Sequence, residues 1–300
     1  MIVTKVHTST GHRAALYALA RGATGQQVLS AGGEGWVVEW NRGAPDTGRV
    51  LASVDTQIFS LLDLPEPQRL VAGNMNGGLH WIDLLRPEQT RNVQHHRKGV
   101  FDLQTHAEWL FSAGGDGTLT RWAWPEARSV ESFQLSNRSL RSIALAPRRG
   151  EIAIGSSDGS IYLLDLETLA LKRSLPNAHL PAVFTLCFSP DQRYLLSGGR
   201  DAMLRVWDME RDMALLSEQA AHWYTLNHIV YSPDGRYFAS ASRDKTVKIW
   251  DAGSFALLKV LDTIRDGGHI NSVNRLLWLS ADCLLSCSDD RSLIWWQISL

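Results

Sequence analysis

The chain has 300 residues, of which 44% are hydrophobic and 20% charged, which is ordinary globular usage and not that of a disordered or collagen-like chain. Lys and Arg number 30 against 31 Asp and Glu, and the net charge of -1 disfavours binding to nucleic acid or an anionic membrane by bulk charge. The length suggests two domains at about 150 residues each, although all-β folds of this size are often one domain.

Cysteine usage and hydropathy set the expected compartment. The three cysteines exclude a disulfide framework, and Cys283 and Cys287 lie about 13 Å apart if their segment is a strand, too far to bridge each other. No apolar run approaches the roughly 18 residues of a membrane-spanning helix. Residues 1–13 lack the apolar stretch of a secretory signal. We therefore predict a reducing, cytoplasmic setting with no membrane association.

Short strand-like runs follow one another along the chain, and the first is residues 2–6, with the letters IVTKV. Clear later examples are residues 194–196, 203–207, 214–216 and 257–260. Pro-Asp, Gly-Gly and Asp-Gly turns separate such runs, and helical periodicity is scarce. The pattern predicts an all-β protein.

A repeat organises these runs. The segment from Ser189 to Asp208 recurs almost letter for letter 43 residues later, from Ser232 to Asp251. Its most regular feature is an acidic or turn residue six positions before a Trp-like residue, and the seven pairs are Glu34/Trp40, Asn76/Ile82, Asp116/Trp122, Asp158/Leu164, Asp201/Trp207, Asp244/Trp250 and Asp290/Trp296. Successive second members are 42, 40, 42, 43, 43 and 46 residues apart. A four-stranded repeat of this length is typical of one β-propeller blade.

At these residues the sequence resembles the WD-repeat (WD40) family over essentially its full length. The motifs that carry the resemblance are Trp207-Asp208, Trp250-Asp251, Gly11-His12, Gly268-His269 and Asp116-Gly117 ahead of Trp122. The resemblance implies an all-β, seven-bladed β-propeller of four-stranded antiparallel blades, with residues 1–300 as a single domain.

The ends of the chain predict how the propeller closes. Only four residues follow Trp296, too few for a further strand, so the seventh blade lacks its outermost strand. Residues 2–6 precede His12 as residues 257–260 precede His269. We expect the N-terminal strand to complete blade seven, which leaves only short protected sheet edges; the alternative is a frayed N-terminus.

In five repeats a histidine, a serine and an acidic residue precede the Trp at similar spacings, and these three residue types are also those of a hydrolase catalytic triad. The five sets are His12/Ser30/Glu34/Trp40, His96/Ser112/Asp116/Trp122, His179/Ser197/Asp201/Trp207, His222/Ser240/Asp244/Trp250 and His269/Ser286/Asp290/Trp296. Five copies of a catalytic triad in one chain are implausible, whereas the family pattern implies structural tetrads that satisfy buried polar groups.

Two blades depart from the pattern. Blade two has Val54, Ala72, Asn76 and Ile82, and blade four has Ser136, Ile154, Asp158 and Leu164, so we expect apolar burial alone to hold both.

Other chemistry finds no support in the sequence. Cys-x-x-Cys is absent, and the pair His95-His96 is better explained by its loop than as a metal site. The glycine run at residues 32–35 lies in a strand-to-strand turn and opens no helix, so it is not a nucleotide loop. We therefore predict no catalytic residues, no metal and no cofactor.

Two columns of the repeat are candidates for binding a partner on the narrow face, where the family makes such contacts. Alignment on the apolar residue four after the His column gives the next position, near the start of each innermost strand, as Tyr17, Phe59, Phe101, Arg141, Phe184, Asn227 and Asn274. The second column holds the residue one position before the acidic or turn residue of each repeat: Gly33, Met75, Gly115, Ser157, Arg200, Arg243 and Asp289. Aromatic residues and Arg are enriched at interfaces, and Arg captures carboxylate or phosphate bidentately. We expect an apolar anchor over blades one to three and an acidic group near Arg141, Arg200 and Arg243; the alternative is that the aromatics plug the channel mouth as core. His222-Trp223-Tyr224 offers a further aromatic pair.

The favoured function is a non-catalytic scaffold that binds a protein or peptide partner, as a monomeric propeller within a larger complex. One alternative is a propeller enzyme of hydrolase or lyase type with a pocket at the channel mouth, but the first column contains no His, Asp or Glu. Another is a structural subunit with permanent interfaces on its flanks.

Overall fold

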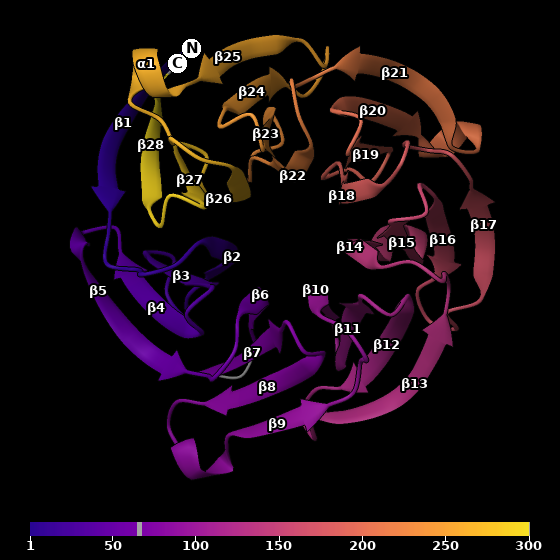
Figure 1. The fold of residues 1–300 in the computed structure, drawn as a ribbon. Coiled ribbons are helices and arrows are strands. Elements are labelled where there is room, and N and C mark those ends of the chain that lie inside the picture. The colour runs from indigo at the N-terminus through magenta and orange to yellow at the C-terminus, as the bar shows by residue number, and fades with distance from the viewer. Residues whose placement is uncertain (65–67, 300) are drawn as a thin grey trace. The chain divides into compact units, whose positions relative to one another are not determined.

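The computed structural model describes residues 1–64 and 68–299. These residues form 28 strands, which pair into seven separate four-stranded sheets (Figure 1). Neighbouring strands run antiparallel, as in the sheet of strands β10 to β13. The predicted all-β class and the seven four-stranded blades are confirmed. A membrane-crossing helix is absent from the described residues, whose one α-helix has only four residues.

The density of internal contacts divides the chain into two compact units. The first unit comprises Met1–Met75, Leu79–Val93 and Val230–Leu300, and the second comprises Asn76–Gly78 and Gln94–Ile229. The assignment of residues 1–300 to a single domain stays a prediction.

Three sheets lie wholly or mainly in the first unit, and their strands are β2 (Leu16–Arg21), β3 (Gln27–Gly32), β4 (Trp36–Asn41) and β5 (Ala44–Ser53); β6 (Ile58–Asp63), β7 (Arg69–Asn74), β8 (Gly78–Asp83) and β9 (Arg91–Gln94); and β26 (Val273–Ser280), β27 (Cys283–Ser288), β28 (Leu293–Ser299) and β1 (Ile2–Ser9). A fourth sheet begins in the second unit and continues in the first, with strands β22 (Leu226–Tyr231), β23 (Tyr237–Ser242), β24 (Val247–Asp251) and β25 (Leu257–Leu261).

The remaining three sheets lie in the second unit, with strands β10 (Val100–His106), β11 (Trp109–Gly114), β12 (Thr118–Ala123) and β13 (Arg128–Gln134); β14 (Leu140–Ala146), β15 (Glu151–Ser156), β16 (Ile161–Asp165) and β17 (Leu171–Leu175); and β18 (Val183–Phe188), β19 (Tyr194–Gly199), β20 (Met203–Asp208) and β21 (Ala214–Ala220). Short helices lie at η1 (Pro87–Gln89), η2 (Pro147–Arg149), η3 (Met209–Arg211) and α1 (Thr263–Asp266). We call the first strand of each sheet its leading strand: β2, β6, β10, β14, β18, β22 and β26.

The N-terminal strand joins the last sheet, as predicted. Strand β1 pairs with β28 from Ile2↔Ser299 to Ser9↔Leu293, so the indigo start of the chain lies beside its yellow end (Figure 1). The strand is longer than the predicted residues 2–6 because buried Ser9 accepts a hydrogen bond from Trp295 Nε1 (2.8 Å) and donates one to the Pro45 carbonyl (2.6 Å). The seventh blade is thereby completed.

A turn with one left-handed residue separates the second and third strands of every sheet. The residue after the turn acid has a positive φ in all seven sheets: Gly35, Gly77, Gly117, Gly159, Ala202, Lys245 and Arg291. At Gly117 the φ is +86°, and an added Cβ would collide with the Ser136 carbonyl oxygen. At position 117 glycine is therefore required for both conformation and space, whereas Ala202, Lys245 and Arg291 adopt the same left-handed conformation in other blades.

The core consists of alternating side chains from neighbouring strands. In the first unit, Ile249, Trp278 and Trp296 belong to one buried apolar cluster. In the second unit, Phe111 and Ile154 belong to another. Each such side chain contributes roughly 1.5–3 kcal/mol when fully buried.

Buried polar groups link neighbouring leading strands in the second unit. The Asp102 carboxylate of β10 accepts the Ile143 N–H of β14 (2.8 Å), and Ser142 Oγ accepts the Leu186 N–H of β18 (3.0 Å). Asp102 is 2% exposed, and the backbone N–H groups of Leu103 and Ile143 supply the hydrogen bonds that a buried carboxyl group requires.

Candidate functional site

The histidine networks expected from the repeat are present, and the His269 network shows their order. Trp296 Nε1 donates to Ser286 Oγ (2.9 Å), which lies 2.9 Å from His269 Nε2. Because Ser286 accepts from the indole, its own hydrogen faces Nε2. Nδ1 then carries the proton that Asp290 accepts at 2.8 Å. Burial alone would raise the pKa of Asp290, but the hydrogen bond and charge of His269 together with the donors Ser292 and the Ile270 N–H outweigh it and lower the pKa to about 2.

Similar networks are found in blades one, three and five, and blade six has the corresponding hydrogen bond between its Trp and Ser residues. His12 contacts Glu34 and Ser30, His96 contacts Asp116 and Ser112, His179 contacts Asp201 and Ser197, and Trp250 Nε1 donates to Ser240 Oγ (2.9 Å). The side chains of His12, His96, His179 and His269 are fully buried. Burial also lowers the pKa of His12 and His179, despite their acidic partners. These imidazoles therefore act in packing, where they join the second strand of the blade to its turn.

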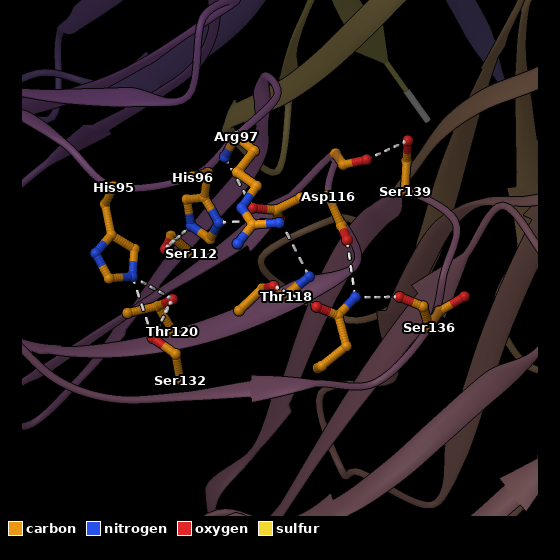
Figure 2. A network of polar contacts seen from close by, with 12 residues as sticks. His95, His96, Arg97, Ser112, Asp116, Thr118, Thr120, Ser132, Ser136 and Ser139 are labelled. Atoms are coloured by element: carbon orange, nitrogen blue, oxygen red, sulfur yellow. Dashed lines mark hydrogen bonds and ion pairs between the residues drawn. The ribbon is translucent and has the colours of Figure 1, made fainter.

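Figure 2 shows the network of the third blade. His96 lies between Ser112 and Asp116, and the Arg97 backbone N–H donates to Asp116 at 2.8 Å. His95 points away from this acid, and its Nε2 lies 3.0 Å from Thr120 Oγ1. Hydroxyl contacts thus account for the His95 ring. Within residues 1–64 and 68–299 no three His, Cys, Asp or Glu side chains are grouped to hold a metal ion.

The prediction that apolar burial alone holds blade four is wrong. Ser136 Oγ donates to Asp158 Oδ2 (2.5 Å), and the hydroxyl of Tyr162 donates to the same oxygen (2.7 Å). A shorter polar network therefore replaces the tetrad there. In blade two the predicted apolar contacts are found, because Val54, Ala72 and Ile82 pack in one cluster.

The seven candidate residues near the starts of the innermost strands share one backbone feature. Tyr17, Phe59, Phe101, Arg141, Phe184, Asn227 and Asn274 are each the second residue of a leading strand and are each half-buried. At the first five and at Asn274 the pairing register skips the residue, which marks a β-bulge. Bulges re-aim side chains and are over-represented next to functional sites.

Three of these residues are brought together in the first unit. The rings of Tyr17 and Phe59 meet edge to face, with centroids 5.4 Å apart. Asn274 Nδ2 donates to the Leu16 carbonyl and to Asp289 Oδ1, both at 2.7 Å. Burial and the charge of Asp289 raise the pKa of Tyr17, which keeps its hydroxyl protonated.

Three others are brought together in the second unit. The Arg141 guanidinium lies 4.1 Å from the ring centre of Phe101 and 5.1 Å from that of Phe184. Its Nε donates to Ser157 Oγ (2.9 Å). Burial lowers the pKa of Arg141, yet an arginine stays charged in proteins. Cation–π contacts of this kind are worth about 0.5–2 kcal/mol.

The acidic group expected near Arg141, Arg200 and Arg243 stays a prediction. Arg200 and Arg243 are exposed in the turns that follow β19 and β23. Among the described residues, the side-chain contacts of Arg141 are with Phe101, Phe184 and Ser157. The cations that accompany Arg141 are different ones, Lys98 and Arg138, which line the same hollow of about 610 Å³.

Comparison with known proteins now adds to this geometry. The family model "WD domain, G-beta repeat" matches residues 171–208 and 214–251. The chain superposes on the solved WD40 β-propeller domain of Doa1 with a TM-score of 0.86, covering 99% of this chain and 97% of that one at 19% identity. These two segments are therefore WD repeats, and the chain as a whole has the fold of a WD40 β-propeller. Its seven sheets are the seven blades.

Curated relatives resemble parts of this WD-repeat protein. It is 26% identical to the Protein LST8 homolog of Drosophila melanogaster over 179 residues, which are 57% of this chain and 56% of that protein. It is 28% identical to the THO complex subunit 6 homolog of Danio rerio over 166 residues, 48% of this chain and 50% of that protein. The aligned region therefore spans about half the length of these relatives.

The sequence analysis named Trp223 and Tyr224 but missed the column of the repeat to which Trp223 belongs. The residue after each network histidine lies in the loop before a leading strand, and in blades five to seven it is apolar and exposed: Leu180 (63%), Trp223 (86%) and Ile270 (61%). Tyr224, next to Trp223, is 61% exposed. The spacing from the histidine column was sufficient to find these positions, because the column itself is visible in the sequence.

Proposed function

We propose that this WD-repeat protein is a non-catalytic scaffold that binds a segment of another protein at the starts of its leading strands. The observation that carries the proposal is the exposure of Trp223, 86%, in the loop before β22, with Tyr224 beside it. Exposed large aromatics concentrate at protein interfaces, and Trp and Tyr dominate their binding energy. The name of one relative, a THO complex subunit, is consistent with a role in an assembly.

Each unit carries its own candidate binding residues for this proposal. Those of the first unit are Tyr17, Phe59, Arg243 and Asn274, and those of the second are Phe101, Arg141, Phe184, Arg200 and Asn227. The half-buried aromatics among them also pack against neighbours, so they hold the binding surface in shape as well as contributing to it. The cytoplasmic location and the monomeric state within a larger complex stay predictions.

The test separates binding from folding. Trp223→Ala removes an exposed side chain, so we expect an unchanged melting temperature and the loss of a protein that the wild type captures from its host. Phe59→Ala and Phe101→Ala should lower both stability and capture. Leu171→Ala, at a 55% exposed position on the outer strand β17, is the matched control and should retain capture. Equal capture by Trp223→Ala, Phe59→Ala and the wild type would refute the proposal.

A further inference from the structure

A basic hollow lies in the second unit between the starts of β10 and β14 and the loops before β14 and β18. Its volume is about 610 Å³, and its charged lining residues are Lys98, Arg138, Arg141 and Asp158. Three cations thus face one carboxylate. A site with this excess of positive charge favours an anionic ligand.

The Arg141 guanidinium is held in place before any ligand arrives. The rings of Phe101 and Phe184 flank it, and Nε donates to Ser157 Oγ at 2.9 Å. Among the described residues Ser157 alone accepts from this guanidinium, so its two terminal nitrogens remain available. A planar fork that is already oriented loses little entropy when it binds a tetrahedral or planar oxyanion.

Asp158 does not neutralise the cations around it. Its oxygens accept hydrogen bonds from Ser136 Oγ (2.5 Å), the Tyr162 hydroxyl (2.7 Å) and the Ser160 N–H (2.8 Å). Burial alone would raise the pKa of Asp158, but these donors outweigh it and hold the pKa below its ordinary value. The carboxylate is committed to its own turn, while Lys98 and Arg138 are exposed and can approach a ligand.

Backbone contacts keep the hollow open. Ser139 Oγ donates to the Gly115 carbonyl at 3.1 Å, which ties the loop before β14 to the turn after β11 (Figure 2). A Cβ on Gly115 would lie 2.9 Å from the Phe101 ring and 3.0 Å from Lys98 Cβ. Glycine at this position leaves room for the ring that supports Arg141.

The rim of the hollow has an apolar side. Leu180 and Pro181 line it, and Leu180 is 63% exposed. A free phosphate ion makes no use of such a surface, whereas a protein segment brings an apolar side chain next to its anionic one. The position of the rim, in the loop before β18, also places it within the surface of the proposed function.

We propose that this basic hollow binds the phosphate of a phosphorylated serine or threonine in the partner segment, with an apolar residue of that segment against Leu180 and Pro181. Phosphate carries a charge of about -1.5 to -2 at neutral pH and three acceptor oxygens, which matches the net excess of two cations better than a single carboxylate. This inference rests on the proposed function and names the chemistry of its ligand.

The test uses the full chain and peptide libraries with degenerate flanks around a fixed central residue. The central residue is phosphoserine, phosphothreonine, glutamate or serine, and the best sequence is then measured by fluorescence anisotropy. We expect phosphorylated peptides to bind at least about tenfold more tightly than their serine counterparts, because hydrogen bonds between charged groups are about twice as strong as those between neutral groups. Apolar residues should be enriched beside the phosphorylated position.

Variants link the effect to the hollow. The exposed pair Lys98→Ala and Arg138→Ala should lower phosphopeptide affinity to that of the serine peptide without a change in melting temperature. Arg128→Ala, at an exposed position on β13, is the matched control and should bind as the wild type does. Arg141→Lys should keep the charge but lose the oriented fork, so it should weaken binding even when folded.

Several outcomes would overturn the inference. They are equal binding of serine and phosphoserine peptides, equal affinity for phenyl phosphate and the phosphopeptide, and equal competition by a single-stranded RNA oligonucleotide. Failure here is distinguishable from failure of the proposed function. If Trp223→Ala abolishes partner capture while phosphatase treatment and the Lys98/Arg138 variants do not, the scaffold function stands and the phosphate inference is wrong.

Discussion

The Ser136 hydroxyl donates a hydrogen bond to Asp158 Oδ2 at 2.5 Å. In four other blades a histidine ring makes the corresponding hydrogen bond to the turn carboxylate. A hydroxyl is much shorter than an imidazole, and it cannot also reach the second strand as a histidine does. Tyr162 on β16 supplies the second donor to the same oxygen (2.7 Å). Blade four thus satisfies its turn carboxylate with two short contacts and fills the Trp position with buried Leu164.

We expect Ser136→Ala and Tyr162→Phe each to lower the free energy of unfolding by about 1–3 kcal/mol, since each leaves part of the Asp158 charge without a donor. The two changes should not be additive, because both donors serve one oxygen. Urea unfolding of the two single variants and the double variant measures this coupling. Ser217→Ala on β21 is the control and should change stability by less than about 0.5 kcal/mol.

The repeat predicted the fold well because each copy carries its own turns and its own Trp position, which are local features of the chain. The Ser136–Asp158–Tyr162 network was missed because only the histidine column was followed, and Tyr162 is outside the repeated polar columns. Asp102 was missed for another reason. Its partner, the Ile143 N–H, is 41 residues away, and only folding brings the two together.

The candidate binding columns were found by alignment, but their geometry was not. The period of the repeat places Arg141 at the start of a strand, yet nothing in that period shows that Phe101 and Phe184 flank it or that Lys98 and Arg138 share its hollow. Those relationships depend on loop conformations between blades.

Acid should lower the stability of the protein in part by protonating Asp290, the carboxylate of the His269 network in blade seven. The folded pKa, about 2, lies below the roughly 3.9 of an unfolded aspartic acid. The folded state therefore binds fewer protons, and the stability contributed by Asp290 is present above about pH 4 and is lost as the pH falls toward 2. Urea midpoints measured between pH 6 and pH 2 should fall in this window. Asp290→Asn should be less stable at pH 6 and show a flatter profile; an unchanged slope would contradict this assignment.

Two glycines with positive φ should respond differently to alanine. Gly117 (φ +86°) has the Ser136 carbonyl where a Cβ would lie, whereas Gly150 (φ +61°) has open space there. Gly150→Ala should cost about 1 kcal/mol from backbone strain alone. Gly117→Ala should cost several times more, because the chain must shift as well. Thermal unfolding of both variants measures the difference, and equal losses would show that the collision is relieved without cost.

Removal of the N-terminal strand should open the seventh blade. Strand β1 covers β28, and without residues 2–9 the edge of β28 and the indole N–H of Trp295 lose their partners. An exposed strand edge promotes association with other chains. We expect the shortened protein to melt at a lower temperature and to elute partly as larger species in size-exclusion chromatography. A synthetic peptide of residues 1–10 should restore the elution volume of the full chain, whereas the same peptide with Val3→Asp should not, because Val3 is buried at 7% exposure. Unchanged stability after truncation would mean that the pairing of β1 with β28 adds little to the closure of the propeller.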